Sequence, residues 1–247
     1  MRMLGAMVLM LMAVAARAEP EVQRFYGYAY DLKTNRYLYT EAHGQKTDGK
    51  RWLSGSIKYY APDGAPLGNK TLDFSANPYV PLYRLDLPGE GYSEGIERID
   101  AGALQMTRTE RGKTETASLK MLPAMVADSG FHAYIVDHFE ALQAGRTLHF
   151  TLAVAGQLTS YRFRAKKLGD TMFDGKSAVR IQIELDSLLR ILADPMLLLY
   201  DEKQHRLLEF LGISNIHNPQ TGDVYNVRIA YYDRPPADAP RNLPPLE

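Results

Sequence analysis

The chain has 247 residues, with 29 Lys and Arg against 29 Asp and Glu, and it contains no Cys. A chain without net positive charge has no general surface for nucleic acid, because such binding rests on neutralising phosphates. The missing sulfur excludes a disulfide scaffold, thiolate metal sites, cysteine nucleophiles and a bacterial lipoprotein anchor. With 45% hydrophobic and 23% charged residues, the composition is that of a folded protein.

The first eighteen residues have the pattern of an export signal. Arg2 precedes an apolar run over positions 3–15, and Ala16-Arg17-Ala18 is the small-x-small pattern that a signal peptidase cleaves. The apolar run is shorter than the roughly 20 residues that a membrane-spanning helix needs. We therefore expect a signal peptide over 1–18, cleavage after Ala18, and a periplasmic protein with no transmembrane span.

Beyond the signal, the dominant sequence period is two, which is the period of a half-buried β-strand. Apolar and polar residues alternate most clearly from Val179 to Leu185, and the same alternation runs through 148–154, 161–164 and 225–231. Turn signals separate further short runs of strand-forming residues. These additional expected strands are 25–31, 36–41, 51–60, 67–74, 83–87, 92–99, 103–109, 114–121, 196–200 and 207–211.

Two segments break the strand pattern. Between Ser129 and Leu142 the apolar residues recur at helical spacing, and Gly145 follows them as a helix stop. This pattern predicts an amphipathic helix near 130–143. A shorter helix is expected over 187–193, where Asp194-Pro195 would end it.

The C-terminus differs from the rest of the chain. Residues 234–247 contain five prolines, which cannot donate to a strand ladder. We expect an extended, mobile, Pro-rich tail there. No repeat and no shift in composition divides the preceding part, so we expect a single antiparallel β domain over 19–233.

These patterns predict a mainly β protein, in which a curved antiparallel sheet, a half-barrel or open barrel, packs around one or two short helices. Strands with one apolar face and an amphipathic helix each need a partner surface, and this arrangement supplies both. An outer-membrane barrel is the main alternative. The helical interruptions and the Pro-rich terminus ending in Glu247 disfavour it, because such barrels commonly close on a strand that ends in an aromatic residue.

The layout resembles that of uncharacterised exported bacterial β-rich proteins, which have strand hairpins, then a short helix, then further strands. The resemblance lies in Leu142-Gln143-Ala144-Gly145-Arg146 before the Leu148 strand and in the segment 207–216, and it covers about the last 120 residues. The layout is also similar to the half-barrels of periplasmic lipoprotein carriers. No diagnostic carrier motif is present, so the resemblance implies a fold and says little about cargo.

No motif for catalysis or metal binding is present. His132 and His138 share the expected helix, but six residues at 100° each place them about 120° apart, whereas helical ligands sit at i and i+4. The sequence has no Gly-x-Ser-x-Gly, no His-Glu-x-x-His, no Gly-x-Gly-x-x-Gly after a strand and no phosphate-binding Gly-Lys-Ser/Thr loop. We expect no metal and no cofactor, and the missing motifs favour a protein that is not an enzyme.

Aromatic residues gather on the first expected strands. Tyrosine couples a large apolar body to a hydroxyl group, so it suits a cavity wall, although ordinary cross-strand packing explains it equally well. The candidate ligand-binding residues are Tyr26, Tyr28, Tyr30, Tyr37, Tyr39 and Trp52.

A basic stripe is the second candidate site. Arg146, Arg162 and Arg164 lie on neighbouring expected segments of an otherwise neutral protein. In an exported protein such a stripe would contact an anionic group, such as a lipid headgroup or lipopolysaccharide. A solvated outer face of the sheet is the simpler explanation.

The sequence therefore favours a non-catalytic periplasmic protein that binds a hydrophobic or amphipathic, lipid-like ligand in a concave β-sheet. Two alternatives stay open. A structural or adaptor protein of the cell envelope would act through protein–protein contacts and present an exposed apolar patch. An unrecognised hydrolase would need a buried polar cluster with shifted pKa values in a cleft.

Overall fold

The computed structural model describes residues 20–49, 51–187 and 194–246. The expected signal peptide over 1–18 and the expected helix over 187–193, apart from Ser187, lie outside these residues. The strands are β1 (Glu21–Asp31), β2 (Tyr37–Asp48), β3 (Arg51–Tyr60), β4 (Pro66–Asp73), β5 (Leu82–Leu87), β6 (Tyr92–Asp100), β7 (Ala103–Glu110), β8 (Lys113–Lys120), β9 (Met125–Ala127), β10 (Leu148–Val154), β11 (Thr159–Phe173), β12 (Lys176–Leu185), β13 (Met196–Asp201), β14 (Leu207–His217) and β15 (Val224–Ala230). Helical segments are η1 (Pro88–Glu90), α1 (Gly130–Asp137), α2 (Phe139–Gln143) and η2 (Ala155–Gln157).

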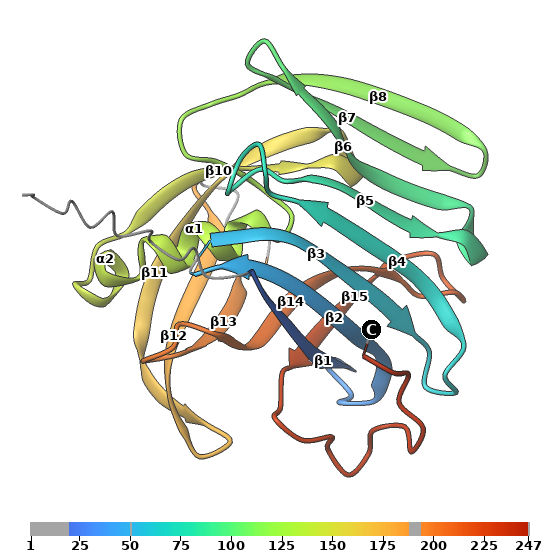
Figure 1. Cartoon of the computed structure of the whole chain (residues 1–247), viewed down its shortest axis with the longest axis vertical. Helices are drawn as coiled ribbons and strands as arrows, with labels where there is room; N and C mark the ends of the chain where they lie inside the picture. The colour runs from blue at the N-terminus through green and yellow to red at the C-terminus, as the bar shows by residue number, and fades with distance from the viewer. Residues whose placement is uncertain (1–19, 50, 188–193, 247) are drawn as a thin grey trace, which may run out of the picture.

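The strands form one open, curved sheet in the order β8-β7-β6-β5-β4-β3-β2-β1-β15-β14-β13-β12-β11-β10-β9. Successive strands pair as neighbours almost throughout, and the exception is β1 with β15, which joins the two halves of the chain through pairs such as Tyr28 with Ala230. Figure 1 shows the sheet curving around α1. The predicted class, a mainly β protein with a curved antiparallel sheet around short helices, is confirmed, and the sheet is open rather than closed.

One pair departs from the antiparallel pattern. Strand β9 runs parallel to β10, with Leu152 opposite Val126. Parallel neighbours need a crossover connection, and here the segment with α1 and α2 supplies it. Strand β9 is not predicted by the sequence pattern, because three residues are too few to show a period.

The predicted helix near 130–143 is present as two short helices. His138, between them, has φ −109° and ψ 17°, which is not helical backbone. The apolar side chains Ile135, Phe139 and Leu142 are buried against the concave face of the sheet, as the spacing predicted. In the described part of the chain, no helix is long and apolar enough to cross a membrane.

The concave face carries two apolar clusters. One draws its residues from β1–β7, β9, β10, β14 and β15 and includes Tyr39, Leu85 and Met106. The second lies under α1 and α2, where Ile181 and Ile183 of β12 meet the helices. Full burial of a side chain of this size contributes roughly 1.5–3 kcal/mol. Of the described helices, α1 and α2 cover the second cluster, and no described helix covers the rest of the concave face.

The two ends of the sheet approach each other without pairing. The turn η2, which follows β10, packs against β6 and β7. Arg108 of β7 donates from Nη1 to the Gly156 carbonyl at 3.0 Å. This contact narrows the opening of the half-barrel on one side.

The C-terminal tail contains no strand, as its prolines predicted, but it folds back onto the sheet (Figure 1). The Tyr26 hydroxyl donates to the Pro244 carbonyl, and the Tyr30 hydroxyl donates to Asp238 Oδ1 at 2.9 Å. Asp233, before the tail, pairs with Lys176 and Arg206. Two tyrosine hydroxyls of β1 thus contact the tail, and its mobility stays a prediction.

Candidate functional site

A cavity of about 1670 Å³ lies on the concave side of the sheet. Helix α1 contributes Phe131 and His132 to its lining, and the remaining lining comes from both halves of the sheet. The cavity therefore occupies the part of the concave face that the helices leave uncovered. Its lining differs in chemistry from one part to another.

Part of the cavity lining that comes from the second half of the chain is apolar. The alternation that buries Leu148 and Phe150 of β10 in the cluster under the helices continues to Leu152, which is only half-buried because it faces the cavity. Neighbouring strands contribute in the same way. We call the following set the apolar wall: Phe131, Leu152, Phe163, Leu185, Met196 and Phe210.

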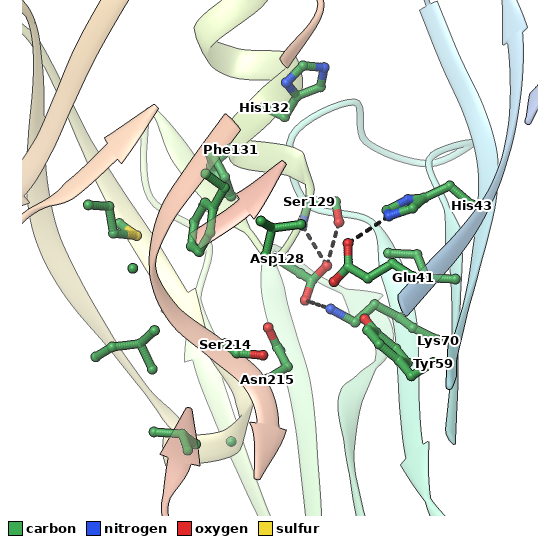
Figure 2. A pocket seen from close by; sticks show the side chains of 18 of the residues that line it. Glu41, His43, Tyr59, Lys70, Asp128, Ser129, Phe131, His132, Ser214 and Asn215 are labelled. Carbon is green, nitrogen blue, oxygen red and sulfur yellow. Dashed lines mark hydrogen bonds and ion pairs between the residues drawn. The ribbon is translucent and has the colours of Figure 1, made fainter. Parts of the chain in front are cut away.

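A group of polar side chains, most of them from the first half of the chain, lines another part of the cavity (Figure 2). Strands β2, β3, β4 and β6 and the loop before α1 supply its side chains. We call the following set the polar cluster: Glu41, His43, Tyr59, Lys70, Glu94 and Asp128. All of its charged members except Asp128 are inward-facing strand residues, in phase with buried apolar neighbours on their own strands.

Lys70 and Asp128 form a buried ion pair. Lys70 Nζ lies 2.6 Å from Asp128 Oδ2, and Lys70 is only 3% exposed. The backbone N–H and hydroxyl of Ser129 donate to Asp128 Oδ1 at 2.6 and 2.8 Å. Burial raises the pKa of Asp128, but the Lys70 charge and these hydrogen bonds outweigh it and hold the pKa below its ordinary value. Each of these two charges therefore compensates the other.

Glu41 and His43 form a second buried pair. His43 Nε2 lies 2.8 Å from Glu41 Oε2, and the Tyr231 hydroxyl donates to the same oxygen at 3.4 Å. The His43 ring stacks on Phe25 with 4.6 Å between centroids. Glu41 Oε1 has no hydrogen-bond partner among the described residues.

Glu94 is held by neutral donors. The Tyr92 hydroxyl donates to Glu94 Oε2 at 2.5 Å, while the Tyr83 hydroxyl and the Asn215 amide donate to Oε1, both at 3.2 Å. Burial, together with the Glu94 charge, raises the pKa of Tyr83 well above its ordinary value, so the hydroxyl stays protonated. The carboxylate is satisfied as an acceptor, and no cation of the described residues is in hydrogen-bond contact with it.

Ser129 and Asp128 are the hydroxyl and carboxylate of the site that lie closest to the arrangement of a nucleophile with its base. The Ser129 hydroxyl donates to Asp128, and the low pKa of that carboxylate makes it a weak general base near neutral pH. Over residues 20–49, 51–187 and 194–246, no group of three or more His, Asp or Glu side chains could hold a metal ion.

Three of the predicted aromatic residues line the cavity, namely Tyr26, Tyr28 and Trp52. Trp52 stacks on Phe74 at 4.4 Å and meets the edge of His132 at 6.2 Å. Tyr26 and Tyr28 lie on the opposite face of β1 from Gly27, where the lining extends to the tail.

Tyr30, Tyr37 and Tyr39 are not part of the lining, and a β-bulge separates the last two. The bulge pairs Ala29 with Tyr39 but Tyr30 with Tyr37, so Tyr37 joins Tyr30 on the tail side of the sheet. Tyr39 points inward and its hydroxyl is joined to Ser214 at 2.6 Å. A strict period of two would have placed Tyr37 and Tyr39 on one face.

The predicted basic residues lie outside the cavity lining. Arg164 donates from Nε to Glu184 at 2.8 Å, and Arg162 lies 3.4 Å from Asp186. Arg146 is exposed in the turn after α2. Cross-strand carboxylates thus accompany two of the three positive charges.

The charged members of the polar cluster are not among the site residues predicted from the sequence. A detectable signal existed, because Lys70 is in phase with the buried Leu72, and Glu41 is in phase with the buried Tyr39. A charged residue at an inward position needs a partner or a cavity. The alternation shows such positions but does not identify the partner.

No protein-family model and no curated protein matches the chain. Among solved structures, it is similar to a beta-barrel-like protein of domain of unknown function DUF1849 from Brucella abortus, with a TM-score of 0.41 and 10% identity over 89% of this chain and 100% of that one. It is also similar to a putative outer membrane lipoprotein-sorting protein domain from Vibrio parahaemolyticus, with a TM-score of 0.29 and 9% identity over 87% of this chain and 84% of that one. These are the two kinds of protein that the sequence layout resembles. At these TM-scores the likenesses support no inference about function.

Proposed function

We propose that the protein is an exported, periplasmic binding protein that holds an amphipathic molecule in this cavity. The observation that carries the proposal is the two-sided lining, with the apolar wall facing the polar cluster across one cavity. An apolar chain placed against the wall gains about 25 cal/mol per Å² of surface removed from water. The polar end of the same molecule meets hydrogen-bonding groups that are already in position.

The size of the cavity fits this class of ligand. At about 1670 Å³ it is larger than the roughly 300–1,000 Å³ that is common for small-ligand pockets. It has room for a long apolar chain in addition to a polar head. A lipid or a lipid-like small molecule has both parts.

The alternatives receive less support. The described exposed large apolar residues are spread over β1, β11, β14, β15 and loops, whereas an adaptor would gather them in one patch. A hydrolase would use a buried polar cluster like this one, but the Ser129 hydroxyl is bound to Asp128 rather than to a histidine.

Filling the cavity tests the proposal. Leu152→Trp combined with Met196→Trp adds bulk at the apolar wall, so binding of the neutral fluorophore N-phenyl-1-naphthylamine should weaken by about tenfold or more, or ~1.4 kcal/mol. The fluorophore is titrated into purified protein and then displaced by twelve-carbon amphiphiles. Organic extraction and mass spectrometry of protein isolated from the periplasm identifies the natural ligand.

The matched control introduces the same residues on exposed positions of β11. Leu168 and Met172 are 47% and 61% exposed, so Leu168→Trp combined with Met172→Trp should leave binding unchanged. Thermal melts of both double variants check folding. The proposal is wrong if the folded cavity variant binds the fluorophore as tightly as the wild type does.

A further inference from the structure

We propose that the polar cluster selects a positively charged organic headgroup, an amphipathic amine, over carboxylate or phosphate headgroups. This inference rests on the proposed function, because it names the ligand class for the same cavity. It is carried by the charge count of the cluster and by two polar atoms that face the cavity without partners.

The cluster has more negative than positive charge. Three carboxylates, Glu41, Glu94 and Asp128, accompany one lysine, and Lys70 compensates Asp128 at 2.6 Å. The hydrogen-bond partners of the other two carboxylates are a histidine, tyrosine hydroxyls and an amide. A buried carboxylate without a cation is costly, so a ligand cation placed here would be stabilised.

Tyr59 is the independent observation that points to a ligand. It is 3% exposed, it lines the cavity, and no hydrogen bond joins its hydroxyl to another described residue. Because no fully buried side-chain polar atom of the described residues lacks a partner, this hydroxyl is open to the cavity. Figure 2 shows it beside Lys70 and Glu41. Burial, and then the charges of Glu41, Asp128 and Glu94, raise its pKa well above the ordinary value. The neutral hydroxyl therefore offers free acceptor lone pairs next to negative charge.

Glu41 Oε1 is the second free acceptor. Both partners of Glu41 use Oε2, so Oε1 has none in the described part of the chain. A primary ammonium group has three N–H donors, which suits a site with several oxygen acceptors and net negative charge. A carboxylate or phosphate head would bring further negative charge to the same oxygens.

Tyrosine rings complete the surroundings. The cluster lies among Tyr39, Tyr83 and Tyr231, whose pKa values the Glu41 or Glu94 charge raises in addition to burial. Lys70 Nζ already lies 5.8 Å from the centroid of the Tyr83 ring. Ring faces attract cations, so they favour an organic ammonium over an anion.

Matched twelve-carbon amphiphiles test the selectivity by displacing N-phenyl-1-naphthylamine from the wild-type protein. Dodecylammonium should displace the fluorophore at a concentration at least tenfold lower than dodecanoate does. Glu94→Gln and Glu41→Gln should each lower this preference several-fold while leaving displacement by neutral dodecanol unchanged. Glu97→Gln, an exposed position on the same strand as Glu94, is the matched control and should change nothing.

Tyr59→Phe removes only the free hydroxyl and separates hydrogen bonding from charge. It should weaken dodecylammonium several-fold but spare dodecyltrimethylammonium, which has no N–H donor. Circular dichroism and thermal melts check that each variant folds.

The outcomes separate the two proposals. Equal or tighter binding of dodecanoate, or a preference that survives both Glu→Gln changes, overturns the headgroup inference and leaves the amphipathic cavity standing. If neither the fluorophore nor any amphiphile binds, the proposed function itself fails, and the headgroup inference fails with it.

Discussion

Charged residues at inward strand positions give the cavity its chemistry. Lys70 shares its face of β4 with the buried Leu72, and it is tolerated there because Asp128, far along the chain, lies 2.6 Å away. Glu41 is instead hydrogen-bonded to the His43 imidazole, and Glu94 to the Tyr92 hydroxyl. The position of a charged residue in the alternation of its strand thus indicates that it is buried. The fold decides which residue pairs with it.

His132 supplies a test at the residue scale. Burial lowers its pKa to about 4 from 6.5, and its Nδ1 lies 3.0 Å from the Tyr200 hydroxyl. Between pH 6.5 and 4 the unfolded chain therefore binds more protons at His132 than the folded chain does. The contribution of the uncharged, buried His132 to the free energy of unfolding is complete above pH 6.5 and is lost as the pH falls towards 4. Urea unfolding at several pH values measures it.

His132→Gln should flatten this pH dependence, because glutamine does not titrate. The comparison is made between slopes, so a general loss of stability in the variant does not obscure it. If the free energy of unfolding depends on pH equally in the variant and the wild type between pH 6.5 and 4, His132 does not have the lowered pKa.

Hairpins and one crossover position the elements. The loop from β9 into α1 holds Asp128 with φ 42°, a left-handed conformation uncommon for a residue with a side chain. Gly130, two residues after Asp128, is the first residue of α1. A Cβ at this position would lie 2.0 Å from the Tyr79 carbonyl oxygen. The same oxygen accepts the Ala127 N–H at 2.9 Å. The close approach of this loop to Tyr79 therefore depends on glycine at 130, and it places Asp128 beside Lys70.

Gly130→Ala should lower the free energy of unfolding by roughly 1–3 kcal/mol, because the new methyl group displaces the start of α1 from Tyr79. Urea unfolding measures the change. Gly89→Ala is the matched control, since a Cβ at 89 meets nothing within 4 Å, and it should change stability by less than about 0.5 kcal/mol. A variant at 130 that is as stable as the wild type would show that the contact is unimportant.

The molecule as a whole is a single sheet curled around its helices, with β8 and β9 at its edges. Pairing of β1 with β15 places the two halves of the chain side by side, and the apolar wall then faces the polar cluster. Strand β8 has no fully buried residue and carries lysine at both ends, which suits an unpaired edge.

Hydrogen exchange followed by mass spectrometry should reflect this arrangement. Amides of β8 are expected to exchange about tenfold faster or more than those of Tyr28, Ala29 and Tyr30 near the C-terminal end of β1, which are buried and lie between two partner strands. Equal protection of the two strands would indicate that β8 is covered in solution, for example by another copy of the chain.

Local pattern determined the elements, since burial of one face and period-two alternation act within a few residues. The strands at 51–60 and 92–99 and the helix near 130–143 follow from it, and so does the class of curved sheet around a helix. The three-residue β9 and the bulge that separates Tyr37 from Tyr39 do not, because neither changes the local composition.

The sequence by itself thus determined a mainly β protein with alternating strands, an amphipathic helix and a Pro-rich end without strands. Only the tertiary structure decided which faces enclose a cavity, that the tail folds back onto Tyr26 and Tyr30, and that Glu41, Tyr59 and Glu94 line the same cavity. The physical reason is the separation along the sequence of the residues that interact. Alternation is a property of neighbouring residues, whereas pairs such as Lys70 with Asp128 form only when strands distant in sequence are brought together.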